Sequence, residues 1–175
     1  MMSVLLSVAA IPRYNASYFP PPIGNPMIQK NKTPSNSVIS TWWPPGHFIK
    51  AIARRSVTFD GASINFPQAY WLANIFLSDN ENDALGILRM LNGSAHEASE
   101  KLESYGLKLS DSVDLLNKIT KLNRPQAFII LANVLKNKDA AMEMVNMTHK
   151  TPPPSYIFLY NEFVEINLQL KFYAR

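Results

Sequence analysis

The sequence predicts a mainly α-helical fold, in which an extended, proline-rich N-terminal arm precedes a compact helical body with a small β component. Apolar residues recur at helical spacing through most of the second half of the chain. Eight of the 13 prolines lie among the first 45 residues. The 175 residues are 47% hydrophobic and 17% charged, which excludes a wholly disordered protein and suits one domain with an arm.

Residues 1–45 form the predicted arm. Prolines cluster at 20–22 and at 44–45. We expect neither cluster inside a helix or a central strand, because proline fixes φ and lacks an N–H group. Ser, Asn and Thr fill much of the intervening sequence. We therefore predict an extended arm over 1–45 and a body over 46–175 that folds without it.

The net charge of +4 is divided unevenly along the chain. The first acidic residue is Asp60, so residues 1–59 carry six basic and no acidic residues, whereas the rest carries 11 basic and 13 acidic ones. An acid-poor basic segment favours contact with a nucleic-acid backbone or an acidic protein surface. The same composition is typical of organelle-import peptides, and a solvated tail without a partner is the third interpretation.

We predict that contacts with a partner or with nucleic acid are made by the basic residues of this region and by its paired tryptophans. The predicted contact residues are Arg13, Lys30, Lys32, Trp42, Trp43, Lys50, Arg54 and Arg55. For the tryptophans, burial in the protein's own core or in an interface is favoured over stacking on bases, because tryptophan is usually buried.

Local signals place the helices of the body. A short helix with a basic face is expected over 48–55. Proline opens two further helices, at Pro67 and at Pro125, and a capping box formed by Ser94 and Glu97 opens another. The predicted helices begin near residues 48, 67, 78–82, 94, 110, 125 and 139, and the last ends near residue 149.

Two segments have the pattern of β-structure. The Asp60-Gly61 pair lies between apolar and β-branched residues, which predicts a β-hairpin over 57–66. Residues 165–172 alternate polar and apolar side chains without exception, which predicts a half-buried C-terminal strand over about 164–173. The apolar run at 156–160 is a further candidate strand.

Pro153, Pro154 and Tyr156 form the short proline–proline–x–tyrosine pattern that WW-type domains bind. Such ligands bind as exposed polyproline II helices. Because the tyrosine also begins an apolar run, burial in a strand competes with recognition by a partner.

Residues that carry catalytic or metal-binding chemistry are sparse. The histidines, His47, His96 and His149, lie far apart in the sequence and form no metal-ligand motif. The sequence contains no cysteine, no glycine-rich phosphate loop and no Gly-x-Ser-x-Gly motif. We therefore predict no catalytic residue, no metal site and no cofactor.

These observations predict a non-enzymatic structural or assembly protein, held by its basic arm among copies of itself or other subunits of a virion coat, matrix or nucleocapsid. A nucleic-acid-binding module is the first alternative, and an accessory subunit of an organellar or secretion complex is the second. No apolar run is long enough to predict a transmembrane helix. Because no export signal is present, we expect an intracellular or virion location, with organelle import as an alternative.

Overall fold

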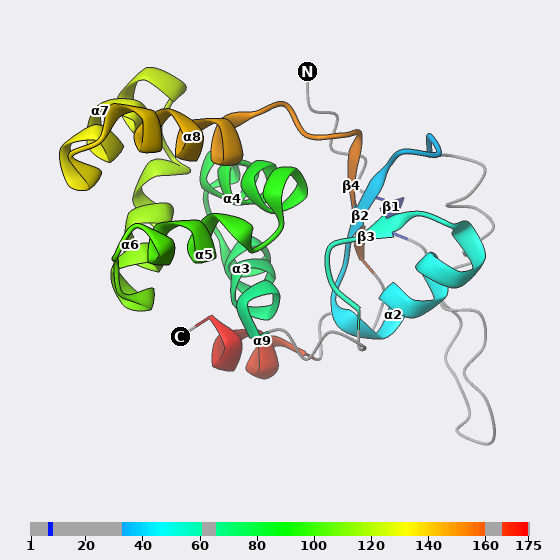
Figure 1. Cartoon of the computed structure of the whole chain (residues 1–175). Coiled ribbons are helices and arrows are strands. Elements are labelled where there is room, and N and C mark those ends of the chain that lie inside the picture. The colour runs from blue at the N-terminus through cyan, green and yellow to red at the C-terminus, as the bar shows by residue number, and fades with distance from the viewer. Residues whose placement is uncertain (1–6, 9–32, 61–65, 160–165, 175) are drawn as a thin grey trace. The chain divides into compact units, whose positions relative to one another are not determined.

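The computed structural model describes residues 7–8, 33–60, 66–159 and 166–174. The chain forms two compact units (Figure 1). Unit 1 comprises Met1–Leu72 and Pro153–Arg175, and unit 2 comprises Ala73–Pro152. The predicted class, mainly α-helical with a small sheet, is confirmed. The boundary predicted at residue 45 differs from this division, because unit 1 is built from both ends of the chain.

Unit 1 contains a parallel sheet with the strand order β1-β4-β2-β3 (Figure 1). The strands are β1 (Ser7–Val8), β2 (Val38–Ser40), β3 (Ser56–Val57) and β4 (Ser155–Leu159). Ile39 pairs with Val57 on one side and with Tyr156 on the other. Ile39 and Phe158 are fully buried, so the two middle strands supply the core of the sheet. Since β2 lies within the predicted arm, removing residues 1–45 removes a central strand.

The hairpin predicted over 57–66 is described only in part, because residues 61–65 lie outside the described residues. Its described beginning pairs in parallel with β2. The Thr58 N–H donates to the Ile39 carbonyl oxygen at 3.1 Å, and the hydroxyls of Ser40 and Thr58 are hydrogen-bonded at 2.7 Å. Strand β4 confirms the candidate strand at 156–160 as far as Leu159.

Helix α2 (Trp43–Phe48) contains the two prolines that were expected to exclude a helix, and that prediction is wrong. The prolines lie in the first turn, where a backbone N–H has no intrahelical partner to lose. A single π-helical turn, η1 (Ile49–Ala53), follows and ends at Arg54, whose φ is +53°. The predicted helix over 48–55 is therefore present, but it begins earlier and ends in a π turn.

Residues 167–173 form helix α9 (Asn167–Tyr173), so the predicted C-terminal strand is wrong. The helix buries Leu170, and the Tyr173 ring packs against Trp42 with the centroids 5.6 Å apart. Leu168 and Phe172 remain 81% and 71% exposed. The segment with strictly alternating polar and apolar residues therefore forms a helix, and two of its apolar side chains are exposed to solvent.

Helix α3 (Phe66–Leu77) crosses the sequence boundary between the units. Unit 2 continues with five helices, which the sequence predicted in the right places. They are α4 (Glu81–Ser94), α5 (Glu97–Ser104), α6 (Leu109–Ile119), α7 (Arg124–Leu135) and α8 (Lys138–His149). Helix α8 packs on α4, α5 and α7, and the core includes Leu116, Ile119, Leu131, Met144 and Val145.

Asparagine caps three of these helices. The Oδ1 atoms of Asn80 and Asn137 each accept two backbone N–H groups, at the starts of α4 and α8. Asn123 and Gln126 form a reciprocal capping box at the start of α7. The predicted Ser94–Glu97 box is wrong, because Ser94 is the last residue of α4 and its hydroxyl donates to the Met90 carbonyl oxygen.

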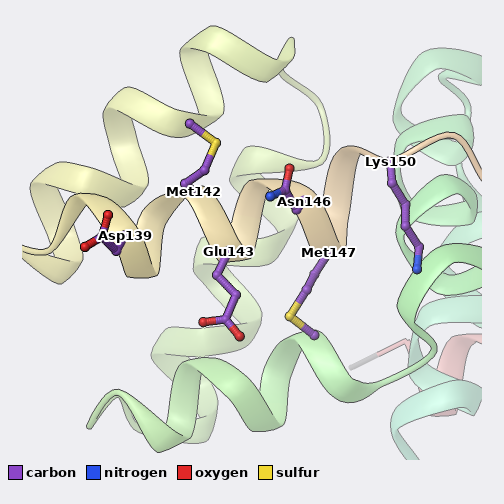
Figure 2. A pocket seen from close by; sticks show the side chains of 6 residues that line it. All are labelled: Asp139, Met142, Glu143, Asn146, Met147 and Lys150. Carbon is purple, nitrogen blue, oxygen red and sulfur yellow. The ribbon is translucent and has the colours of Figure 1, made fainter.

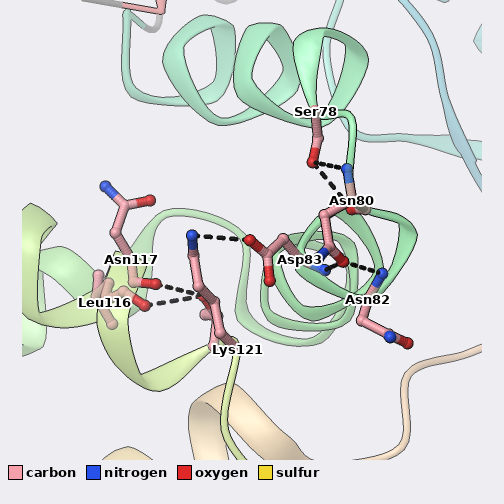
Figure 3. Close-up of polar contacts among 8 residues, drawn as sticks. Ser78, Asn80, Asn82, Asp83, Leu116, Asn117 and Lys121 are labelled. Carbon is pink, nitrogen blue, oxygen red and sulfur yellow. Dashed lines mark hydrogen bonds and ion pairs between the residues drawn. The ribbon is translucent and has the colours of Figure 1, made fainter.

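The C-terminal ends of α6 and α8 are joined to α4 by one side chain. Arg89 donates from Nη2 to the Thr120 carbonyl oxygen and from Nε to the Thr148 carbonyl oxygen, both at 3.1 Å. Close to it, Lys121 Nζ lies 2.8 Å from Asp83 Oδ2, which joins the start of α4 to the chain just after α6 (Figure 3). The two Arg89 hydrogen bonds satisfy carbonyl groups that a helix end leaves without intrahelical partners.

Candidate functional site

A groove on unit 2 runs along helix α8 and has a volume of about 530 Å³ (Figure 2). It is open rather than enclosed, and it combines acidic, basic, amide and thioether side chains. The lining residues are Asp139, Met142, Glu143, Asn146, Met147 and Lys150. Glu143 and Met147 point to the same side of α8, so a carboxylate and an apolar group are presented together.

Two side chains, Lys101 of α5 and Tyr105 just after it, fix the Glu143 carboxylate. Lys101 Nζ lies 2.8 Å from Oε1, and the Tyr105 hydroxyl donates to Oε2 at 2.5 Å. These hydrogen bonds lower the pKa of Glu143 below its ordinary value, and the bond from Lys101 has the larger effect. The bond to Glu143 likewise raises the pKa of Lys101 and that of Tyr105. The groove therefore presents an ionised acceptor whose orientation is already set.

The other polar groups of the groove are supplied by neighbouring elements. The Arg124 guanidinium of α7 donates to the Asn146 side-chain oxygen. The Lys150 stem covers Gly93, as a methyl group at that glycine would come within 3.2 Å of Lys150 Cε. Within the ranges that the structure describes, no three His, Asp or Glu side chains are grouped to hold a metal ion. The groove's groups can bind a polar ligand through hydrogen bonds and ionic contacts.

His149 lies at the end of α8 and is half-buried. Its Nε2 is 3.1 Å from the Leu122 carbonyl oxygen, and its Nδ1 is 2.8 Å from the Thr148 hydroxyl. Burial lowers the pKa of His149 below its ordinary value, and the nearby Arg89 and Arg124 lower it further. The neutral ring, which donates from Nε2, is thus the form that the fold stabilises.

We expect the stability of unit 2 to fall as the pH drops below about 6.5, the ordinary pKa of histidine. Between the ordinary pKa of histidine and the lowered pKa of His149 in the fold, the unfolded chain is protonated at His149 and the folded chain is not. The stabilising contribution is therefore complete above the ordinary pKa and is lost as the pH falls to the folded-state pKa. Urea unfolding at a series of pH values measures this pH dependence of the free energy of unfolding. His149→Asn should flatten the dependence; a variant whose profile equals that of the parent would contradict the assignment.

In unit 1, the predicted contact residues have different environments. Lys50 Nζ lies 3.0 Å from the Asp60 carboxylate, while Arg54 is exposed. Arg55 is buried and donates to the Thr33 carbonyl oxygen at 2.7 Å and to the Thr33 hydroxyl at 3.1 Å. Arg13, Lys30 and Lys32 lie outside the described residues. Contact of these residues with a partner stays a prediction.

The two tryptophans are also in different environments. Trp42 is fully buried, and its ring centroid lies 5.6 Å from those of both Phe59 and Tyr173. Trp43, the first residue of α2, is 45% exposed. The structure therefore uses Trp42 to join α2 and α9, and leaves Trp43 partly available to a ligand or partner.

Of the predicted WW-type ligand, Pro153 and Pro154 lie in a bend just before β4, and only Tyr156 lies in a strand. Tyr156 belongs to β4, which pairs with both β1 and β2, and the Pro154 carbonyl oxygen accepts the Val38 N–H at 2.9 Å. Recognition of this motif by a WW-type domain stays a prediction. His96 Nε2 lies 3.2 Å from Glu100 Oε1 on α5. No sequence signal pointed to the groove, because Tyr105 and Glu143 are 38 positions apart and meet only through packing of α5 on α8.

Comparison with known proteins shows similarity to two archaeal enzymes. The chain is 41% identical over 143 residues to the dolichyl-phosphooligosaccharide-protein glycotransferase of Methanocaldococcus jannaschii, which covers 78% of this chain. It is 38% identical over 142 residues to the protein of the same name from Methanococcus voltae, which covers 77%. The chain spans about 15% of the length of each of these curated relatives. No protein-family profile and no solved structure matches the sequence.

These relatives overturn the function predicted from the sequence. The relatives are named as glycotransferases, so the predicted non-enzymatic virion or assembly subunit is wrong, and so is the intracellular or virion location that went with it. The error has a physical origin, because a basic, proline-rich segment reports charge and backbone stiffness, which many unrelated activities share. Among the described residues, no helix has both the length and the apolar character needed to cross a membrane.

Proposed function

We propose that the chain forms part of a glycotransferase that moves an oligosaccharide from a dolichyl-phosphate-linked donor to protein. The observation that carries this proposal is the 41% identity to the Methanocaldococcus jannaschii glycotransferase across 78% of the chain. The second relative, 38% identical, carries the same name. Since the chain spans about 15% of either protein, we propose that it contributes to substrate binding and that other parts of the enzyme carry out the transfer.

The groove on α8 is the part of the described structure that best suits such a role. Oligosaccharides present many hydroxyl groups, each of which both donates and accepts hydrogen bonds. Glu143, already oriented by Lys101 and Tyr105, offers an acceptor without a further loss of side-chain freedom. Asn146 and Lys150 add amide and ammonium groups, and an open groove accommodates an extended ligand. We therefore propose that this groove contacts the donor's oligosaccharide.

A chimera tests the proposal. The matching region of the Methanocaldococcus jannaschii glycotransferase is replaced by the corresponding 143 residues of this chain, and transfer from the dolichyl-phosphooligosaccharide to an acceptor peptide is measured. We expect transfer to be retained, because the two segments share enough sequence to fold alike. A folded chimera without transfer would contradict the proposed function.

Glu143→Gln in the chimera tests the groove separately. It removes the charge that holds Lys101 and Tyr105, so we expect KM for the donor to rise about 5- to 20-fold with a smaller change in kcat, as for a lost binding contact. Glu103→Gln is the matched control, since Glu103 is an exposed carboxylate on α5 that is absent from the groove lining. If both variants keep the parental KM, the groove does not contact the donor.

A further inference from the structure

Helix α9 carries a second apolar face, which points away from unit 1. The inward face consists of Leu170, which is buried, and Tyr173, which packs on Trp42. Leu168 and Phe172 are four positions apart, so they lie one above the other on the opposite side of the helix. They are the two most exposed large apolar side chains in the described structure, at 81% and 71%.

A cationic side chain lies at the edge of this face. Lys171 is exposed on the same helix, at the edge of the face that Leu168 and Phe172 form. The half-exposed Trp43 follows Trp42, whose ring contacts Tyr173, so the start of α2 lies next to α9. Exposed apolar side chains with a lysine at their edge are the composition of a surface that enters the interfacial region of a bilayer.

The charge of the chain is concentrated in the same unit. The sequence of unit 1 contains eight basic and three acidic residues, whereas unit 2 contains nine basic and ten acidic ones. The net positive charge of the protein is therefore carried by the unit that exposes Leu168 and Phe172. A net positive charge on the unit, with Lys171 next to Leu168 and Phe172 on α9, complements an anionic lipid surface and adds to binding.

We propose that the outward face of α9, formed by Leu168, Lys171 and Phe172, docks unit 1 on an anionic bilayer surface. This inference rests on the proposed function for its choice of partner, because a dolichyl-linked donor is a lipid and a protein that uses it works at a membrane surface. Leu168 and Phe172 enter the interfacial layer and Lys171 contacts lipid phosphates. The face thereby brings unit 1 to the surface in which the donor is anchored.

Vesicle flotation of the full chain tests this docking. The vesicles are phosphatidylcholine with or without about 30% phosphatidylglycerol, a lipid of negative charge. We expect the chain to float with the anionic vesicles and to bind them less as the ionic strength rises. Leu168→Ser combined with Phe172→Ser should lower the partition coefficient by at least about tenfold, because two apolar side chains leave the lipid. Lys171→Glu should weaken binding to anionic vesicles while leaving weak binding to neutral ones unchanged.

Unit 2 provides a matched control. Leu109 and Ile129 are 58% and 59% exposed there, so replacing both with serine removes comparable apolar surface without touching α9. Circular dichroism confirms that each variant is folded, and Leu168→Ser alone serves if the double variant is not. Equal loss of binding in the two double variants, or no flotation of the parent chain, overturns the proposal. So does a parent chain that sediments as a dimer and becomes a monomer in the α9 variant, because a second copy then covers the face.

The outcome is separable from that of the glycotransferase test. If the chimera transfers oligosaccharide while the isolated chain ignores vesicles, the docking proposal fails and the proposed function stands. If the chain binds anionic vesicles through α9 while the folded chimera lacks transfer, the docking surface stands and the proposed function fails.

Discussion

Replacing Gly86 with alanine is expected to destabilise unit 2 by about 3 kcal/mol or more, although alanine is the better helix former. Gly86 lies on the face of α4 that meets the end of α6. A Cβ at this position would lie 2.2 Å from the Thr120 carbonyl oxygen and 2.9 Å from its carbon. Both are backbone atoms, so the helices themselves would have to separate.

Separation of the helices would also remove the contacts of Arg89. Arg89 lies one turn after Gly86 and donates to the same Thr120 carbonyl oxygen and to that of Thr148. Hydrogen bonds from a charged donor contribute about 1.5–3 kcal/mol each, which exceeds the gain of about 1 kcal/mol in helix propensity. Urea unfolding followed by far-UV circular dichroism measures the change in the free energy of unfolding.

Gly93 is the matched control on the same helix. Its added methyl group would lie 3.2 Å from Cε of the flexible Lys150 side chain, which can move away, and at an ordinary contact distance of 3.6 Å from the Met147 carbonyl oxygen. Gly93→Ala should therefore be neutral or slightly stabilising. If the two alanine variants unfold at the same urea concentration, α4 does not approach α6 as closely as the structure shows.

The helices of unit 2 could be predicted because their signals are local. Proline at the first turn of α7, the apolar spacing within α6 and the start of α8 each depend on residues a few positions apart. The sheet of unit 1 could not be predicted in this way. Its register joins Ile39 to Val57 and to Tyr156, so it depends on segments more than a hundred positions apart, and parallel pairing leaves no hairpin signal.

The C-terminal segment and the groove show two other limits of local patterns. Alternation over 165–172 predicted a strand, but burial of Leu170 and the contact of Tyr173 with Trp42 stabilise a helix. In this seven-residue helix, tertiary packing outweighed the two-residue alternation that favours a strand. In the groove, the orientation of Glu143 comes from Lys101 of α5 and from Tyr105, which follows α5. Neither the fixed carboxylate nor the class of ligand therefore follows from the spacing of charged residues in the sequence.

Gly46→Ala is expected to destabilise unit 1 by about 2–4 kcal/mol, because α2 rests directly on the backbone that follows β3. A Cβ at Gly46 would lie 2.4 Å from the Phe59 carbonyl oxygen and 3.0 Å from Asp60 Cα. The residues four positions before and after it contact the same segment. Trp42 packs on the Phe59 ring, and Lys50 pairs with Asp60. Pushing the helix away would weaken both contacts together.

Tryptophan fluorescence during urea unfolding follows this change, since Trp42 is buried between Phe59 and Tyr173. His47→Ala is the control, because it alters the neighbouring exposed position of α2 without adding an atom toward Phe59. We expect the control to unfold within about 0.5 kcal/mol of the parent, as surface substitutions do. A Gly46→Ala protein as stable as this control would show that a side chain fits between α2 and residues 59–60. The face formed by Trp42, Gly46 and Lys50 would then not require a glycine at its centre.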